Sequence, residues 1–243
     1  MESNIEKITF PSVLNVTDQE IDVSILNEKQ KEFYLELFQE FINIYNSKQK
    51  SRVIIALAGP SGSGKSVINS LFKEFSKQTE LPFQFETLGI DAFHYSNKTL
   101  ESLGLKEYKG RFDTYDVNKL LKTIDDFSKG KNVSLPIYSR ITHDPVEDSK
   151  SISEERVLLL LEGLWLLYDD SGWEKVLPYI DFSFFIDAKK EIVRDLVIKR
   201  HVAGGRSIEE ASLRYDEIDG KNFDLAMEIK NKADKIIPPY YTI

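Results

Sequence analysis

Short apolar segments recur along the chain at intervals that leave room for helices between them. Residues 52–58 read Arg-Val-Ile-Ile-Ala-Leu-Ala, and residues 157–161 read Val-Leu-Leu-Leu-Leu. A strand of this composition is buried on both faces, which is typical of a parallel sheet covered by helices. The same pattern predicts strands at 83–90 and 182–186, and a short last strand at 235–237.

Between these segments, apolar residues recur with helical spacing. In residues 28–50 they form one stripe, which predicts a helix that packs on the rest of the chain: Phe33, Leu35, Phe38, Phe41, Ile42 and Tyr45. Further helices are predicted at 66–78, 117–129, 189–202 and 207–215. Weak alternation in residues 5–25 predicts a hairpin or an arm, and residues 133–138 read as a short extended segment.

Strands that alternate with helices predict a doubly wound α/β fold with right-handed crossovers. We expect residues 1–50 to form an N-terminal arm and helix packed on a main domain of residues 51–243. The strands end either in a Gly-rich loop or near a carboxylate, at Asp91, Glu162 and Asp187. Ligands of open α/β sheets bind at the carboxyl ends of the strands, so these ends should converge on one site.

Composition and charge narrow the class of protein. The 243 residues carry a formal net charge of -8, and so acidic a surface repels nucleic-acid phosphates. There is no cysteine, which excludes disulfides, thiolate metal sites and cysteine nucleophiles. Residues 1–10 lack the apolar core of a signal peptide, and no apolar run is long enough to span a bilayer. We therefore expect a cytoplasmic protein that binds neither nucleic acid nor membrane.

The Gly-rich segment Gly59-Pro-Ser-Gly-Ser-Gly-Lys65-Ser66 matches G-x-x-x-x-G-K-[ST], between a predicted buried strand and a predicted helix. Glycines let backbone N–H groups turn towards phosphate oxygens, and the helix adds its positive N-terminal end. Lys65 would reach the β- and γ-phosphates, and the Ser66 hydroxyl would ligate Mg²⁺. The residues expected to bind nucleotide here are Gly59, Ser61, Gly62, Ser63, Gly64, Lys65, Ser66 and Val67.

Two carboxylates follow the predicted strands. Asp91 could take the proton of an acceptor hydroxyl and hold it in line with the γ-phosphorus, although Asp at a strand end is also a common helix cap. Glu162 follows a very apolar strand, where burial requires a partner such as a metal-bound water. We expect Ser66, Glu162 and Asp91 to surround the metal ion.

A locally basic stretch follows residue 189 in this acidic chain. Its arginines could neutralise the migrating phosphoryl group, and Gly204-Gly205 would supply the flexibility of a closing lid. The alternative is a solvated helix face with charge pairs four residues apart. We favour a functional role for Arg200 and Arg206 and leave Arg194 open. The three histidines show no metal-ligand spacing.

Several further motifs occur in order along the chain: Asp91-Ala-Phe-His94, Lys109-Gly-Arg-Phe-Asp113, Pro136-Ile-Tyr-Ser-Arg140, His143-Asp-Pro145, Glu162-Gly163 and Arg200-His-Val-Ala-Gly-Gly-Arg206. With the Gly-rich loop, this set resembles the phosphoribulokinase/uridine kinase family, in a branch related to bacterial pantothenate kinase. The resemblance covers roughly residues 50–237. It departs from the family at Ala92, where many relatives have Gly, and at Leu164, where many have a polar residue.

The resemblance implies a P-loop NTPase three-layer fold, with a mostly parallel five-stranded sheet, helices on both faces and an arginine-bearing lid. It implies an ATP- and Mg²⁺-dependent kinase that phosphorylates a hydroxyl of a small metabolite, a sugar, nucleoside or pantothenate-like acceptor. By the same resemblance Asp91 is the catalytic base, acting with Lys65, Arg200 and Arg206, and Asn222 lies near the nucleotide. The residues that it assigns to the acceptor pocket are His94, Arg111, Tyr138, Arg140 and His143.

The alternative to a kinase is a nucleotide-binding switch or regulatory module without kinase activity. Asn231-Lys-Ala-Asp234 spells the guanine-recognition pattern N-K-x-D, and Asp169-Asp-Ser-Gly172 spells D-x-x-G. Neither lies where a predicted buried strand ends, so we favour the kinase. The acceptor's identity and the oligomeric state, including a homodimer, stay open.

Overall fold

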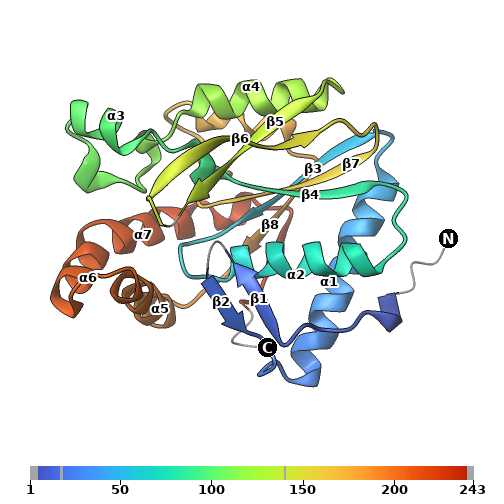
Figure 1. Cartoon of the computed structure of the whole chain (residues 1–243), viewed down its shortest axis with the longest axis horizontal. Helices are drawn as coiled ribbons and strands as arrows, with labels where there is room; N and C mark the ends of the chain where they lie inside the picture. Colours follow the sequence, from blue (N-terminus) through green and yellow to red (C-terminus); the bar gives the residue numbers. More distant parts are fainter. Residues whose placement is uncertain (1–4, 17–18, 140, 240–243) are drawn as a thin grey trace.

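The computed structural model describes residues 5–16, 19–139 and 141–239. Its centre is a five-stranded parallel sheet in the order β4-β7-β3-β8-β9 (Figure 1). The strands are β3 (Arg52–Ala58), β4 (Gln84–Gly89), β7 (Val157–Gly163), β8 (Phe182–Ile186) and β9 (Lys235–Ile237). The predicted α/β fold with helices on both faces is confirmed.

The long helices follow the predicted ranges closely. They are α1 (Glu28–Ser47), α2 (Lys65–Gln78), α4 (Val117–Ser128), α5 (Lys190–Ala203) and α6 (Ile208–Arg214). A further helix, α7 (Gly220–Glu228), lies outside the predicted ranges. A π-helical turn, Tyr215–Asp219, joins α6 to α7. The predicted N-terminal hairpin is present as β1 (Val13–Val16) paired with β2 (Gln19–Asp22).

Alternate residues of the sheet strands serve two separate cores. In β3, Val53, Ile55 and Leu57 face one core, whereas Ile54, Ala56 and Ala58 face the other. The first core is filled by α1, α2 and the N-terminal hairpin, and the second by α4, the β5–β6 hairpin and the loops after β7. A strand that supplies both cores has no polar face, which is why β3 and β7 read as continuous apolar runs.

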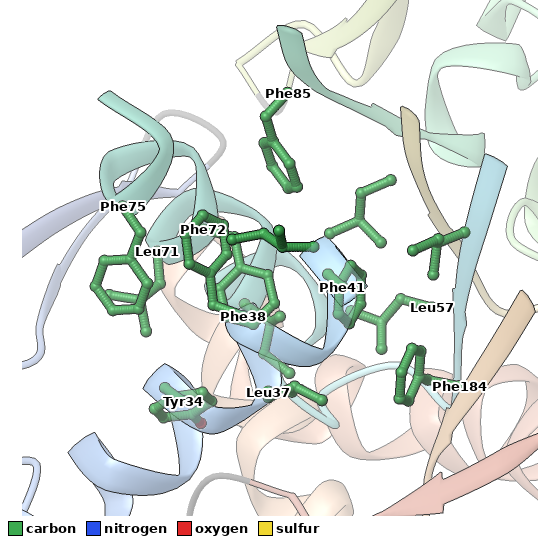
Figure 2. Close-up of a cluster of buried hydrophobic side chains, with 14 of the residues drawn as sticks. Tyr34, Leu37, Phe38, Phe41, Leu57, Leu71, Phe72, Phe75, Phe85 and Phe184 are labelled. Atoms are coloured by element: carbon green, nitrogen blue, oxygen red, sulfur yellow. The ribbon is translucent and has the colours of Figure 1, made fainter. Parts of the chain in front are cut away.

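Aromatic rings dominate the first core (Figure 2). Phe38 of α1 is fully buried, and its ring contacts those of Phe72, Phe75 and Phe85 at centroid distances of 5.2, 5.5 and 6.0 Å. The predicted stripe on α1 needs one correction, because Phe33 and Leu35 are only partly buried. The positions that face the core are spaced by three and four residues: Tyr34, Leu37, Phe38, Phe41, Ile42 and Tyr45.

Besides α7, one helix and one strand have no counterpart in the predictions. Helix α3 (Asn97–Ser102) is short, and β6 (Asp144–Ile152) pairs antiparallel with β5 (Val133–Ser139) in a hairpin beside the main sheet. The sequence of β6, Asp-Pro-Val-Glu-Asp-Ser-Lys-Ser-Ile, is mostly polar and gives little strand signal by itself. Pairing with β5 supplies the hydrogen bonds that hold this segment extended.

The end of β4 differs from the prediction in one respect that concerns the site. The strand ends at Gly89, and residues Ile90–Phe93 form a 3₁₀ turn, so Asp91 lies within a turn rather than at the last strand residue. Ile90 packs directly against Gly163, where an added Cβ would lie 2.5 Å from the Ile90 side chain. Only glycine at 163 allows the turn to approach β7 so closely.

Candidate active site

The loop between β3 and α2 has the backbone of a phosphate-binding cradle. The loop contains three glycines with positive φ angles, Gly59 (148°), Gly62 (79°) and Gly64 (100°). Residues other than glycine rarely adopt such backbone angles. A Cβ at Gly59 would also lie 3.1 Å from Ser63 Oγ and 3.2 Å from Ile186. The glycines at these positions are therefore required by the fold of the loop.

Two polar side chains lie inside this cradle. The Lys65 ammonium donates hydrogen bonds to the carbonyl oxygens of Gly59 and Pro60, at 2.8 and 2.9 Å. The Ser63 hydroxyl is fully buried and has no hydrogen-bond partner. A phosphate bound in this loop could accept hydrogen bonds from both the Ser63 hydroxyl and the Lys65 ammonium. The two side chains therefore fit a phosphate-binding loop.

Ser66 and Glu162 meet directly beside the cradle. Ser66 is the second residue of α2, and its Oγ donates to Glu162 Oε1 at 2.9 Å. Glu162 is aligned with Leu57 of β3 and Gly89 of β4, so its position follows from the register of three central strands. Mg²⁺ takes oxygen ligands from one or two protein groups plus water and phosphate, and this pair fits that requirement. Among the described residues, no cluster of three or more His, Asp or Glu side chains forms a metal site built from protein alone.

Asp91 lies about half exposed at the cavity, with 51% of its side chain accessible. The Tyr115 hydroxyl donates to Asp91 Oδ1 at 3.3 Å, and His94 Nε2 lies 3.8 Å from the same oxygen. Burial, together with the Asp91 charge, raises the pKa of Tyr115 well above its usual value. Tyr115 therefore stays protonated and can keep donating to the carboxylate.

His94 is buried next to Asp91 and stacks on Tyr115 with ring centroids 3.8 Å apart. Its Nδ1 lies 3.1 Å from the carbonyl oxygen of Thr114, which can only accept, so Nδ1 carries the proton. Burial lowers the pKa of His94 to about 4, against a smaller opposing effect of Asp91. The imidazole is neutral near pH 7, and its Nε2 is a hydrogen-bond acceptor beside the carboxylate.

The lid arginines come from the end of α5 and the turn after it. Arg200, Gly204, Gly205 and Arg206 all line the cavity. Arg206 Nη1 donates to Nδ1 of His201 at 2.8 Å, and His201 Nε2 lies 2.9 Å from Asp219. Hence Arg206 is connected through His201 to the turn that joins α6 and α7.

Arg194 has structural partners instead. Its guanidinium contacts Ser212 Oγ at 2.9 Å and Asp216 at 3.6 Å, and lies over the Tyr215 ring. These contacts join α5 to α6 and to the π-helical turn after it, and Arg194 is not among the residues that line the cavity.

A cavity of about 640 Å³ lies at the carboxyl ends of the strands and brings most of the predicted residues together. Those that line it are Ser61, Gly62, Gly64, Lys65, Ser66, Val67, Asp91, His94, Tyr138, His143, Glu162, Arg200, Arg206 and Asn222. Gly59 and Ser63 lie beneath the loop surface and shape the cradle from within.

Arg111 is not among the lining residues. Its guanidinium forms a bidentate pair with Asp113, with both N–O distances 2.7 Å, and lies over the ring of Tyr108. Arg140, the other arginine expected in the acceptor pocket, lies outside the described residues.

Asn222 is buried, and its Nδ2 donates to the carbonyl oxygen of Gly110 at 3.1 Å. The Trp165 indole donates to the same oxygen at 3.1 Å. Asn222 thus fixes the turn at residues 109–111 against the cavity wall.

Two cavity-lining cations were not singled out from the sequence. Lys109 donates to Asn97 Oδ1, the carbonyl oxygen of His143 and Asp144, and burial lowers the pKa of Lys109. Arg214, at the end of α6, donates to the carbonyl oxygens of Glu107 and Lys109. Lys109 begins the Lys-Gly-Arg segment already noted in the sequence, whereas Arg214 reads there as an ordinary helix residue.

The N-K-x-D residues have a structural role far from the phosphate loop. Asp234 Oδ2 accepts from the backbone N–H and the hydroxyl of Ser183, at 2.8 and 2.6 Å, near the start of β8. The phosphate loop follows the opposite, carboxyl end of the neighbouring strand β3. Asp234 therefore stabilises the sheet at the edge away from the cavity.

Comparison with known proteins agrees with this architecture. Residues 54–238 match the model of the phosphoribulokinase / uridine kinase family. The chain is 32% identical over 225 residues to the uncharacterized protein YggC of Escherichia coli strain K12, covering 92% of this chain and 93% of that protein. It is 29% identical over 212 residues to the pantothenate kinase of Haemophilus ducreyi, covering 76% of this chain and 67% of that enzyme.

Among solved structures, a putative fructose transport system kinase from Silicibacter sp. TM1040 superimposes with a TM-score of 0.75 at 24% identity, over 84% of this chain and 98% of that one. At this identity the likeness concerns the fold. No helix in the described part of the chain is long and apolar enough to cross a membrane. The expected phosphotransferase class, with an alcohol group as acceptor, is confirmed. With its phosphate loop, sheet order and matching residues 54–238, the chain belongs to the phosphoribulokinase / uridine kinase family.

Proposed function

We propose that this protein transfers the γ-phosphate of ATP to a hydroxyl group of a small polar metabolite. One observation carries the proposal: the phosphate loop, Glu162 and Asp91 all face the same cavity. A kinase needs a phosphate cradle, a metal-facing oxygen pair and a base on the acceptor side. Here the three come from β3–α2, from β7 and from the turn after β4.

In this proposal Ser66 and Glu162 hold Mg²⁺, with Asp91 beside them. The bound ion would supply positive charge that neutralises the phosphate oxygens. Lys65 exchanges its carbonyl partners for phosphate oxygens, and the backbone N–H groups between Gly59 and Lys65 bind the remaining ones.

Asp91 takes the proton of the acceptor hydroxyl and holds that oxygen in line with the phosphorus. Tyr115 orients Asp91 by donating to one oxygen of the carboxylate. His94, neutral and with Nε2 unprotonated, accepts a hydrogen bond from a second hydroxyl of the acceptor. Tyr138 and His143 line the same wall.

The lid arginines complete the site when ATP and acceptor are bound. Arg200 and Arg206 stabilise the negative charge on the migrating phosphoryl group, and Gly204-Gly205 allows their segment to close. Closure also removes water, which otherwise competes as the phosphoryl acceptor.

The acceptor belongs to a class of compounds with several hydroxyl groups: a sugar, a nucleoside or a pantothenate-like molecule. The lining supports this class, because His94, Asn97 and Asn222 offer neutral polar groups while Lys109 and Arg214 offer positive charge. The name of one relative, the pantothenate kinase of Haemophilus ducreyi, points in the same direction.

The decisive experiment measures ADP release from Mg²⁺-ATP against nucleosides, pantothenate, glycerate, hexoses, pentoses and their phosphates. We expect at least one compound to raise ADP release well above the acceptor-free rate, and the Lys65→Ala variant to remove that increase. If no compound raises the rate while ATP still binds, the regulatory nucleotide-binding module becomes the better account.

A further inference from the structure

A second cavity, of about 690 Å³, opens beside Asp91, and the segment from Arg200 to Arg206 does not line it. We call it the hairpin groove, because its walls are the N-terminal strand β1, helix α2, the end of β4 and residues 136–138 of β5. Ser66, Asp91 and Glu162 line both cavities. A molecule whose hydroxyl reaches Asp91 can therefore extend into the hairpin groove.

The wall formed by α2 is polar along its whole length. Residues spaced by three and four positions on one face of this helix line the groove: Ser66, Asn69, Ser70, Lys73, Glu74 and Lys77. The opposite face carries the apolar residues of the first core (Figure 2). A polar helix face is ordinarily left to solvent. Here β1 lies beside it (Figure 1), and Ser70 Oγ donates to the carbonyl oxygen of Asn15 at 3.1 Å.

Asn69 is the clearest sign that the groove is built for a ligand. Its side chain is only 8% exposed, and its Oδ1 is buried without a hydrogen-bond partner. A buried acceptor without a partner is unfavourable for folding, and a ligand donor would satisfy it. Asn69 lies one helical turn from Ser66, so a ligand hydroxyl donating to it would lie close to the reacting centre.

Lys73 lines the groove about two helical turns beyond Ser66 on α2. Lys77 is paired with Glu74, and Lys150 of β6 with Glu86, but none of the ion pairs between described side chains involves Lys73. Burial and the neighbouring Lys73 charge lower the pKa of Lys150 to about 8. Two ammonium groups close together repel each other, and an anion between them would relieve that repulsion.

We propose that the hairpin groove binds the anionic end of the phosphate acceptor, with Lys73 contacting a phosphate or carboxylate and Asn69 contacting a hydroxyl between that group and Asp91. Ser66 and Lys73 are seven residues apart, a rise of about 10 Å along α2. An extended sugar phosphate fits this separation. The inference rests on the proposed kinase function, and it specifies the acceptor as a polyhydroxy compound with a negative charge distant from the hydroxyl that receives phosphate.

The hairpin groove uses a part of the chain outside the matched family region. Strand β1 supplies one wall, whereas the family match begins at residue 54. The structure therefore adds a recognition surface to the family's common core.

A binding experiment tests the groove without requiring turnover. With the phosphate loop saturated by Mg²⁺ and a non-hydrolysable ATP analogue, inorganic phosphate is titrated calorimetrically into the wild type and into Lys73→Gln, Lys73→Arg and Asn69→Asp variants. We expect Lys73→Gln to weaken phosphate binding by about tenfold or more, and Lys73→Arg by much less. Asn69→Asp should also weaken it, because it places a negative charge one helical turn from Lys73. The matched control is Lys122→Gln, which removes an exposed lysine of α4 that is paired with Asp126. Absence of phosphate binding to the wild type, or equal affinity in Lys73→Gln, would overturn the proposal.

A kinetic experiment tests whether this anion belongs to the acceptor. Sugars and polyols are compared with their terminal phosphates in the ADP-release assay. We expect the phosphorylated compounds to be better acceptors, and Lys73→Gln to raise their KM about tenfold with little change in kcat. Phosphate binding at Lys73 with an unchanged acceptor KM would overturn the acceptor assignment. If no compound is phosphorylated, the proposed kinase function fails, and the phosphate titration alone decides whether the groove binds anions.

Discussion

The phosphate loop and the hairpin groove lie along the same helix, α2, but they are constructed differently. The loop is one continuous segment, Gly59 to Ser66, whose glycines fix its conformation locally. The groove combines α2 with β1, β4 and β5, and its lining residues on β1 and β5 are up to 125 positions apart in the chain (residues 13 to 138). The phosphate loop recognises a group common to all nucleoside triphosphates, whereas in our proposal the hairpin groove recognises the acceptor. On that proposal, a local motif binds the shared phosphate group, and contacts between distant elements provide acceptor specificity.

The largest effect should come from the loop itself. Lys65→Ala removes the ammonium that we propose binds the β- and γ-phosphates, so we expect ADP release to fall to background for every acceptor. ADP release is measured by a coupled assay, with Lys122→Ala as the control. Retained turnover would show that the loop does not perform phosphoryl transfer.

The second-largest effect should come from Asp91, which lines both cavities. Asp91→Asn keeps the shape of the side chain but removes the proposed base, so we expect kcat to fall by about 10²–10⁴-fold. ATP affinity, measured by calorimetry, should stay within a few-fold of wild type, because Asp91 faces the acceptor. A variant with near-normal kcat would exclude Asp91 as the base.

The core behind α2 should affect stability rather than chemistry. Phe38→Ala empties a fully buried position among three other rings and should lower the free energy of unfolding by about 3–5 kcal/mol. Urea unfolding followed by circular dichroism measures the change. The partly buried Phe33 is the matched control on the same helix, and Phe33→Ala should cost clearly less. Equal losses would contradict the observed orientation of α1.

The smallest effect concerns the contact that holds the hairpin over the groove. Ser70→Ala removes the hydrogen bond to Asn15 and should lower the free energy of unfolding by about 1 kcal/mol. Ser76→Ala is the control, since that hydroxyl bonds only within α2, to the carbonyl oxygen of Lys73. Hydrogen exchange should show faster opening of β1 in Ser70→Ala alone. Unchanged exchange there would mean that apolar packing of Leu14 and Val16 suffices to hold the hairpin.

The sequence by itself determined the sheet and the phosphate end of the site. Apolar runs specify strands buried on both faces, and a glycine loop between strand and helix specifies a phosphate cradle, because both depend on local backbone and burial preferences. Parallel strands then bring Glu162 and Asp91 to the same edge as Lys65, so their convergence followed from the strand order.

Only the tertiary structure decided which polar residues meet across elements. Arg111 resembles an acceptor-binding residue in the sequence, but its neighbour Asp113 binds it, and Lys109 and Arg214 line the cavity instead. The polar strand β6 is extended because β5 pairs with it. Likewise, the polar face of α2 reads in the sequence as a solvated helix surface. It becomes the wall of a groove because β1, which lies about 50 residues earlier, packs over it. Such contacts depend on the whole fold, which local spacing does not encode.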